Sequence, residues 1–182
     1  NMPTNGLKPD RVVEWVARFR KNCPECNINV SISLDGFGQT HDTQRGVPGN
    51  FYKSLETMKK VNDYFKDDAK VLINASTVIT KYNIDQVYDF MNWLYVRFNA
   101  SNHTIEAARG MTREDGVKIL TEKSLREIQD KVSPVYSAYA QRLAAGSAGI
   151  SKPIARCFYQ GIVRMMYNIR ASNIDGPTPW PM

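Results

Sequence analysis

Strict alternation of hydrophobic and polar residues marks the stretch from residue 28 to residue 35. The hydrophobic positions are Ile28, Val30, Ile32 and Leu34, and the polar positions are Asn29, Ser31, Ser33 and Asp35. A period of two places these sets on opposite faces of a β-strand. Helical patterns on both sides indicate a parallel strand, and parallel sheets are usually covered on both faces. The polar face therefore predicts either a ligand cavity or a sheet with one solvated face.

Other segments of the chain alternate between strand and helix patterns. Hydrophobic spacing predicts helices over about 9–22, 51–66, 84–97 and 121–145, and a last one from Pro153 to about Ala171. Strands are predicted over about 28–35, 70–79 and 103–107, with a polar loop from Gly36 to Gly49. This order predicts an α/β fold of parallel strands with outer helices. Its chemistry is expected at the carboxyl ends of the strands, where the following loops meet.

Length and composition limit the class of protein. The 182 residues fit one domain, and no hydrophobic run approaches the roughly 20 residues of a membrane span. The polar start resembles no signal peptide and lacks an initiator Met, so the chain is expected to be a piece of a longer protein. Three cysteines favour a reducing cytoplasm. The net charge of +6 is scattered, so nucleic acid is not an expected partner.

A series of short motifs continues from the alternating strand. They are Ser33-Leu34-Asp35-Gly36, His41-Asp42, Arg45-Gly46, Gly49-Asn50-Phe51, Ile73-Asn74-Ala75-Ser76-Thr77-Val78, Asn83, His103-Thr104-Ile105-Glu106 and Arg109-Gly110. In this order and spacing the chain resembles the middle of a radical S-adenosylmethionine (SAM) enzyme. The branch is the one with a C-terminal SPASM-type cluster domain, which includes sulfatase-maturing and peptide-modifying enzymes. The resemblance covers roughly residues 10–110.

The resemblance implies a fold and an activity for the full-length protein. The family fold is a six-stranded partial (β/α) barrel, a TIM-like fold, whose fourth to sixth strands residues 1–110 would supply. Residues 111–182 would form a helical extension toward a missing C-terminal domain. The enzyme would be an iron–sulfur oxidoreductase that uses a [4Fe–4S] cluster to cleave SAM reductively to a 5′-deoxyadenosyl radical. That radical would abstract hydrogen from a peptide, protein or small molecule, with ferredoxin or flavodoxin as electron donor.

Three of the implied cofactor-binding residues follow the first strand. The family's serine at the Ser33 position and its arginine at the Arg45 position hold the SAM carboxylate. This role suits the residue type, because a guanidinium pairs with a carboxylate through two parallel hydrogen bonds. Asp35 is expected either to bind the ribose or to brace the turn.

Three further implied residues lie on the other two strands. Asn74 and Ser76 would line the cavity toward the nucleoside, and Glu106 would lie near the adenine or the substrate. Because Ser33, Asn74 and Ser76 share strand parity, all six residues are expected to gather at one end and one face of a parallel sheet. No residue of this chain is expected to bind metal, and none is assigned a catalytic role.

The chain also departs from the family pattern. The cluster-binding Cys-x-x-x-Cys-x-x-Cys motif and the glycine-rich strand that meets the SAM amino group are absent from these residues and would precede residue 1. The cysteine-rich domain would follow Met182. The chain alone is therefore expected to be inactive. It is also expected to self-associate through the open edge of the first strand, or to cover that edge with its tail after Gly149.

Two further motifs, and a second function, also fit the sequence. Cys23-Pro24-Glu25-Cys26 has the ligand spacing of a zinc or iron site, but one pair is half a site and Cys157 falls in a helical pattern, so a structural or incidental role is expected. His41 beside Asp42 is expected to stabilise a turn rather than to donate a proton. The alternative function is a non-catalytic α/β binding module with a mildly basic surface that meets a partner or nucleic acid. A three-cysteine motif upstream of Asn1 would distinguish the two functions.

Overall fold

The computed structural model describes residues 1–98, 100–108, 117 and 121–145. One sheet holds four strands, which are β1 (Met2–Thr4), β2 (Ile28–Ser33), β3 (Val71–Ile79) and β4 (Asn102–Ala107). The helices are α1 (Pro9–Asn22), α2 (Gly38–Arg45), α3 (Asn50–Tyr64), α4 (Val87–Arg97) and α5 (Glu122–Ala145). The strands are parallel and lie side by side in chain order. The α/β class predicted from the sequence is confirmed.

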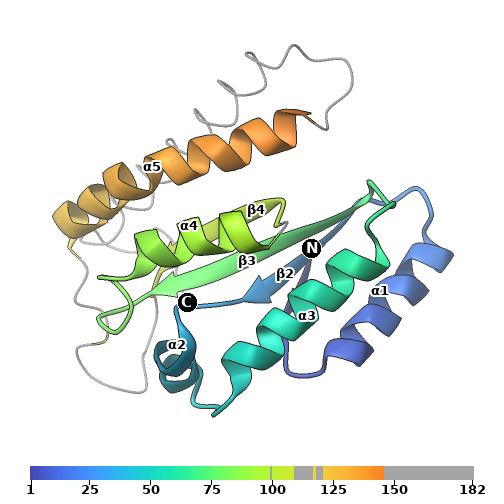
Figure 1. Ribbon diagram of the computed structural model, residues 1–182, viewed down its shortest axis with the longest axis horizontal. Coiled ribbons are helices and arrows are strands. Elements are labelled where there is room, and N and C mark those ends of the chain that lie inside the picture. The colour runs from blue at the N-terminus through green and yellow to red at the C-terminus, as the bar shows by residue number, and fades with distance from the viewer. Residues whose placement is uncertain (99, 109–116, 118–120, 146–182) are drawn as a thin grey trace, which may run out of the picture.

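The helices cover the hydrophobic face of the sheet. Figure 1 shows α1, α3 and α4 layered over the strands, with α5 running alongside α4. The alternating hydrophobic residues of β2 and β3 form a core with α1, α3 and α4. A second core joins α5 to α4 and to β4. Burial of one strand face is thus the consequence of the period-two pattern, because every second side chain points toward the helices.

The first strand was not predicted, and it changes the edge of the sheet. Residues Met2, Pro3 and Thr4 pair in parallel with Val30, Ser31 and Ile32. The prediction that β2 forms an open edge in this chain is therefore wrong, and so is the expectation of three strands. The new edge strand is only three residues long and contains Pro3, which has no N–H to offer another chain. Short strands and proline are the usual protection of a sheet edge.

The segment predicted as a polar loop contains α2. Only His41 of its eight residues is buried, so the helix has no hydrophobic stripe to reveal it. It ends where Gly46 adopts a left-handed conformation, with φ of 67°. The carboxylate of Asp42 stabilises the start of the next helix, α3. It accepts hydrogen bonds from Gly49 N (2.6 Å) and Phe51 N (2.8 Å).

The remaining boundaries match the sequence prediction to within a few residues. The helix predicted from about residue 84 begins three residues later, because α4 starts at Val87 with Gln86 as its N-cap. The predicted helix from Pro153 and the residue Cys157 lie outside the described residues, and the division at residue 110 stays a prediction. None of the described helices is long and apolar enough to cross a membrane.

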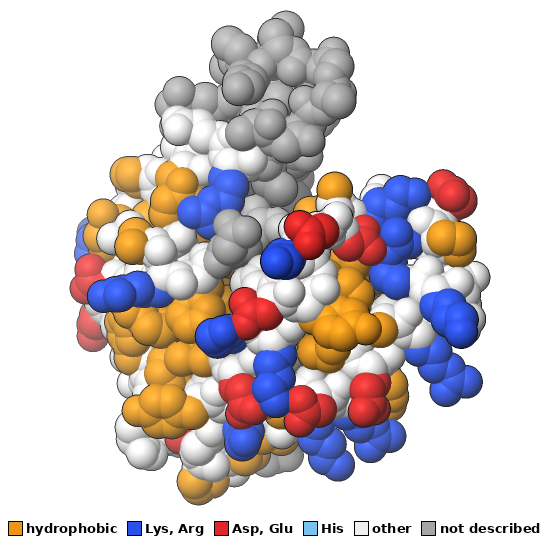
Figure 2. Space-filling model, turned by 45° about the vertical axis from the view of Figure 1, so that its right-hand side comes forward, with side chains coloured by type: hydrophobic (Ala, Val, Ile, Leu, Met, Phe, Trp, Pro, Cys, Tyr) orange, Lys and Arg blue, Asp and Glu red, His pale blue; other side chains and the backbone are white. Residues whose placement is uncertain are grey.

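Charged side chains on the helical surface are mixed in sign. Figure 2 shows Lys and Arg interspersed with Asp and Glu, with hydrophobic side chains between them. Lys60 pairs with Asp10 across α1 and α3 at 2.7 Å and with Glu56 on its own helix at 3.0 Å. On this face the positive charge is therefore partly neutralised, which agrees with the scattered charge seen in the sequence.

Candidate functional site

The polar residues of three strands lie in rows across the second face of the sheet. Ser31 of β2 is opposite Asn74 of β3, which is opposite Asn102 of β4. One step closer to the carboxyl ends, Ser33, Ser76 and Thr104 form the next row. Residues directly paired in parallel strands point to the same face. The sequence-based expectation that Ser33, Asn74 and Ser76 share a face is therefore confirmed.

Asn74 links the first row to the second. With its amide oxygen facing the hydroxyls, it accepts from Ser31 Oγ at 3.0 Å and Thr104 Oγ1 at 3.3 Å, and its nitrogen donates to Asn102 O at 3.0 Å. Ser31 and Asn74 are buried. Ser33 and Ser76 are half-buried, and within the described part of the chain neither hydroxyl makes a hydrogen bond. The second row therefore keeps hydrogen-bonding capacity at the carboxyl end of the sheet.

Asp35 lies just beyond β2, with 1% of its surface exposed. Its Oδ1 accepts from Val78 N of β3 at 2.8 Å and from Arg45 Nη2 at 3.0 Å, and Arg45 Nε lies 2.6 Å from Oδ2. The buried carboxylate thus has a cationic partner and a backbone donor, as a buried charge requires. Asp35 braces the turn after β2, which is one of the two roles expected for it.

His41 supports the same turn from α2. Its Nδ1 accepts a hydrogen bond from Asp35 N at 3.0 Å, which assigns the ring proton to Nε2 when the ring is neutral. The ring is fully buried, and this burial lowers the pKa of His41 below its usual value, although the nearby Asp35 carboxylate opposes the shift. The expectation of a turn-stabilising residue agrees with this contact, but the residue lies in a helix rather than in a loop.

Asn83 and two glutamines join the ends of β2 and β3, and the sequence analysis did not assign them to the site. Asn83 Nδ2 donates to Asp35 O at 2.5 Å and to Val78 O at 2.8 Å, while its Oδ1 accepts from Thr80 N at 2.8 Å. Gln44 Nε2 donates to Val78 O at 2.8 Å. Gln86 Oε1 accepts from Phe37 N at 2.9 Å. The loops after the two strands are therefore cross-linked by side chains.

Glu106 lies on the same face but nearer solvent. Glu106 pairs with Val78 of β3, and the N–H of Val78 donates to the Asp35 carboxylate. Glu106 therefore lies near the carboxyl ends of β2, β3 and β4. The side chain of Glu106 is exposed. Ser33, Ser76 and Glu106 thus lie on the open face, whereas Asp35 and Arg45 pair with each other at its end. Which of these residues contacts a cofactor stays a prediction.

The cysteine pair lies at the opposite end of the sheet, before β2. Cys26 is exposed and Cys23 is half-buried, and both are free thiols. Cys26 N donates to Cys23 O at 3.1 Å, so the four residues form a turn. The described residues contain no cluster of three or more His, Cys, Asp or Glu side chains arranged to hold a metal ion.

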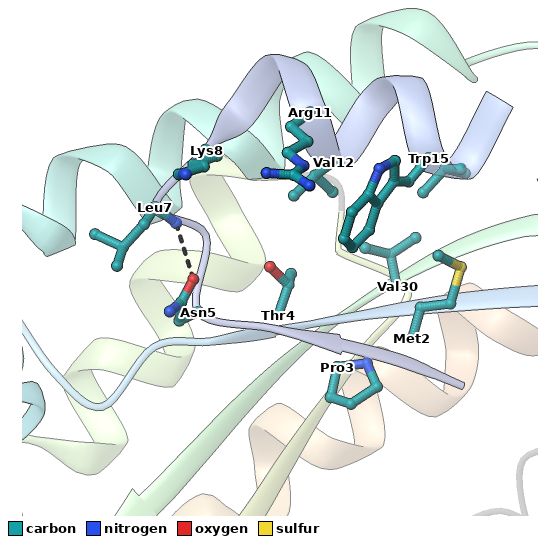
Figure 3. A pocket seen from close by; sticks show the side chains of 11 residues that line it. Met2, Pro3, Thr4, Asn5, Leu7, Lys8, Arg11, Val12, Trp15 and Val30 are labelled. Atoms are coloured by element: carbon teal, nitrogen blue, oxygen red, sulfur yellow. Dashed lines mark hydrogen bonds between the residues drawn. The ribbon is translucent and has the colours of Figure 1, made fainter. Parts of the chain in front are cut away.

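A groove of about 360 Å³ lies at the β1 edge and is separate from the polar face (Figure 3). Its wall includes Met2, Thr4 and Val30 from the strands and Val12 and Trp15 from α1. These three strand residues have the parity of the helix-covered side, whereas Pro3, which also lines the groove, has the opposite parity; the groove therefore lies at the sheet edge beside α1.

Comparison with known proteins gives matches in both sequence and fold. No family model matches the chain. It is 36% identical over 90 residues to the sporulation killing factor maturation protein SkfB of Bacillus subtilis (strain 168), a match covering 49% of this chain and 19% of that protein. It is 33% identical over 104 residues to the cysteine-type anaerobic sulfatase-maturating enzyme of Clostridium novyi (strain NT), covering 54% and 25%. The chain thus spans about a quarter or less of the curated relatives it matches.

Solved structures give the same result for the fold. Native anSMEcpe with bound AdoMet matches with a TM-score of 0.54 and 16% identity, over 75% of this chain and 36% of that one. The structure of native anSMEcpe with bound AdoMet and the Cp18Cys peptide matches equally well. At 16% identity the structural matches show only a shared fold. The evidence that the chain is related to these enzymes comes from the sequence matches at 36% and 33% identity. Together they confirm the resemblance: the chain is a relative of the sulfatase-maturase branch of the radical SAM superfamily, over part of the length of those proteins.

Proposed function

We propose that this chain is part of the catalytic barrel of a radical SAM enzyme that modifies a peptide or protein. In the full-length protein, the polar face at the carboxyl ends of β2, β3 and β4 would bind SAM. The cluster-binding cysteines would come from outside this chain, so these residues alone would bind SAM weakly and would not cleave it.

One observation carries the proposal. Ser33 and Ser76 lie opposite each other at the carboxyl end of the sheet, and within the described residues their hydroxyls have no hydrogen-bond partner. Ligands of open α/β sheets bind at this end of the strands. Two adjacent unpaired hydroxyls, with Thr104 beside them in the same row, suit the ribose hydroxyls and the amino-acid portion of a nucleoside such as SAM.

The residues at this end also fit the carboxylate of SAM. Arg45 uses Nε and Nη2 toward Asp35, and within the described ranges its Nη1 makes no hydrogen bond. Its side chain is 28% exposed, so a carboxylate can reach it. A guanidinium has five N–H donors and can bind two carboxylates at once. The expected pairing of Arg45 with the SAM carboxylate is therefore compatible with its ion pair to Asp35.

In this proposal the cofactors supply the radical chemistry, and the residues of this chain bind and orient SAM. When bound, the [4Fe–4S] cluster and SAM supply the electron and the 5′-deoxyadenosyl radical that abstracts hydrogen from the substrate. This chain orients SAM through Ser33, Ser76 and Arg45, and its hydrophobic core keeps the strand ends in register. Glu106 is exposed at the end of β4. In this proposal it would contact the adenine or the substrate.

The relatives support a peptide as the substrate class. One sequence match is a maturation protein for the sporulation killing factor, and the other is a sulfatase-maturating enzyme. One of the structural matches holds AdoMet together with a peptide. An open sheet face beside the SAM position offers room for an extended segment, and we therefore favour a peptide over a small molecule.

Calorimetric titration of SAM into the cluster-reconstituted full-length protein tests the proposal. Arg45→Ala should weaken SAM binding by about 1.5–3 kcal/mol, the scale of a hydrogen bond between charged groups. Arg97→Ala is the matched control, because Arg97 is exposed in the last turn of α4, at the other end of the sheet. Unchanged affinity in Arg45→Ala would remove this residue from the site. A wild-type protein that binds no SAM, or lacks a three-cysteine motif, would favour the non-catalytic binding module.

A further inference from the structure

The polar groups of Asp35 all face partners within the described part of the protein, and only Oδ2 makes no hydrogen bond there, lying in ion-pair contact with Arg45 Nε. Its N–H donates to His41 Nδ1, and its carbonyl accepts from Asn83 Nδ2. Its carboxylate accepts from Val78 N and faces Nε and Nη2 of Arg45. With 1% of the side chain exposed, the carboxylate has no surface left for a ligand. A residue that binds a ribose must present an accessible acceptor, and the buried, ion-paired carboxylate of Asp35 does not.

The ion pair fixes the direction of the Arg45 side chain. Both carboxylate oxygens lie along one edge of the guanidinium, at 2.6 Å from Nε and 3.0 Å from Nη2. Because the guanidinium is planar, this two-point contact determines its plane and leaves Nη1 on the opposite side. Arg45 is also the last residue of α2, after which Gly46 turns the chain away. An otherwise flexible side chain is thus held in one orientation.

The same contacts tie Arg45 to the end of β3. Val78 N binds the carboxylate that orients Arg45, and Gln44, the preceding residue, donates to Val78 O. Asn83 donates to Val78 O as well as to Asp35 O. These contacts therefore fix the position of the guanidinium relative to β3, the strand that carries Asn74 and Ser76.

Resting on the proposed function, we propose that Asp35 is a positioning residue that does not contact SAM and acts by directing Arg45 Nη1 toward the SAM carboxylate. Holding the guanidinium in place before binding lowers the entropy lost when the ligand is bound. Asp35 then affects recognition of the carboxylate alone, and it has no effect on recognition of the adenosine.

Two ligands separate these roles in the full-length, cluster-reconstituted protein. SAM has the amino-acid carboxylate, whereas 5′-methylthioadenosine has the same nucleoside and lacks it. Asp35→Asn should weaken SAM binding about tenfold, the size expected when one charge-assisted hydrogen bond is misaligned, and leave methylthioadenosine binding unchanged. If only the charge facing the SAM carboxylate mattered, removing the negative Asp35 beside Arg45 would strengthen the attraction of Arg45 for that carboxylate, so a weaker binding of SAM points to lost orientation.

A double-mutant cycle shows whether Asp35 acts through Arg45. In the Arg45→Ala background, Asp35→Asn should cause no further loss of SAM affinity. Gln39→Ala is the matched control on the same helix, since Gln39 is exposed and, among the described residues, its side chain donates only to Thr43 at 3.2 Å. That control should bind both ligands as the wild type does.

Several results would overturn the inference. Equal loss of affinity for the two ligands would assign Asp35 to the nucleoside, and unchanged or tighter SAM binding would remove its role. If Asp35→Asn does not fold by circular dichroism, Asp35→Glu keeps the charge but displaces the carboxylate by one methylene, and the same SAM-only loss is expected. A wild type that binds neither ligand would reject the proposed function itself, which is a different outcome from a wild type that binds both.

Discussion

The two faces of the sheet use the same strands for different purposes. On the helix-covered face, Ile32 and Ala75 are adjacent in register and fully buried. On the other face, their neighbours Ser33 and Ser76 are half-buried and hydroxylated. The first face is stabilised by removal of hydrophobic surface from water, whereas the second is held by side-chain hydrogen bonds from Asn74.

This difference indicates which face determines the fold and which determines the site. Hydrophobic burial is worth about 25 cal/mol per Å², so the covered face contributes most of the stability. A hydrogen bond between neutral groups adds only about 1 kcal/mol net. Substitutions on the covered face should therefore change the free energy of unfolding strongly, and those on the polar face should change it little while altering ligand binding.

The largest effect is expected at Ile32. Its side chain is fully buried between β2 and the helices, so Ile32→Ala removes packed methyl groups and leaves a cavity. The free energy of unfolding should fall by about 2–5 kcal/mol in urea denaturation. Leu72→Ala is the matched control, because Leu72 lies on the open face and is 38% exposed. A loss at Leu72 equal to that at Ile32 would contradict the contrast between the faces.

A pH-dependent loss is expected from His103, a polar residue on the covered face. Thr77 Oγ1 donates to Leu34 O, so His103 Nε2, 2.7 Å away, must donate to Thr77. Burial lowers the pKa of His103 to about 3. Since the unfolded chain takes up a proton near pH 6.5 and the folded one does not, stability is complete above that pH and is lost as pH falls toward 3.

Between pH 7 and pH 5 this histidine should cost about 2 kcal/mol of the free energy of unfolding, measured by urea denaturation at each pH. His103→Gln should remove most of that dependence. The remainder is assigned to His41, whose pKa is also lowered by burial. The chain has two histidines, so His103 and His41 are the histidine side chains that can contribute in this range. A pH dependence that is unchanged in His103→Gln would show that the ring is not the titrating group.

A smaller loss is expected at Asn74 on the polar face. Asn74→Ala removes the amide that joins Ser31 to Thr104, and the free energy of unfolding should fall by about 1 kcal/mol. Asn29→Ala is the control, because Asn29 lies on the same face of β2 and makes no side-chain hydrogen bond within the described residues. Equal melting curves for the two variants would mean that the Asn74 network does not stabilise the sheet.

The smallest change in stability is expected at Ser33. Its hydroxyl is unbonded within the described ranges, so Ser33→Ala should alter the free energy of unfolding by less than about 0.5 kcal/mol. SAM affinity of the full-length protein should nevertheless fall, measured by the same calorimetric titration. A destabilised protein with normal SAM binding would reverse the roles assigned to the two faces.

Much of the fold could be predicted because burial leaves a periodic signal. The alternation in β2 and β3 predicted both their faces and the residues that share them. The strand β1 and the helix α2 lacked such a signal. β1 is three residues long and includes a proline, and α2 buries only His41. Both elements are held by contacts with neighbouring segments, which a local pattern cannot reveal.

The site could be predicted in part for the same reason. Ser33, Asn74 and Ser76 were placed on one face by strand parity, whereas the roles of Gln44 and Asn83 were missed. Gln44 binds a backbone carbonyl 34 residues away, and Asn83 binds one 48 residues away. Polar side chains that bind distant backbone groups follow no spacing rule, and so the sequence alone could not assign them.

The brevity of β1 has a kinetic consequence. β1 pairs with β2 through three residues, and α1 lies between the two strands in the chain, whereas β2 and β3 pair through six. The backbone amides of β1 are therefore less protected from hydrogen exchange than those between β2 and β3. They should exchange with solvent deuterium through local opening, well before those at the β2–β3 pairing, which await global unfolding. Each opening uncovers the edge of β2 for a moment. Any self-association through that strand would therefore proceed at a rate set by how often β1 detaches.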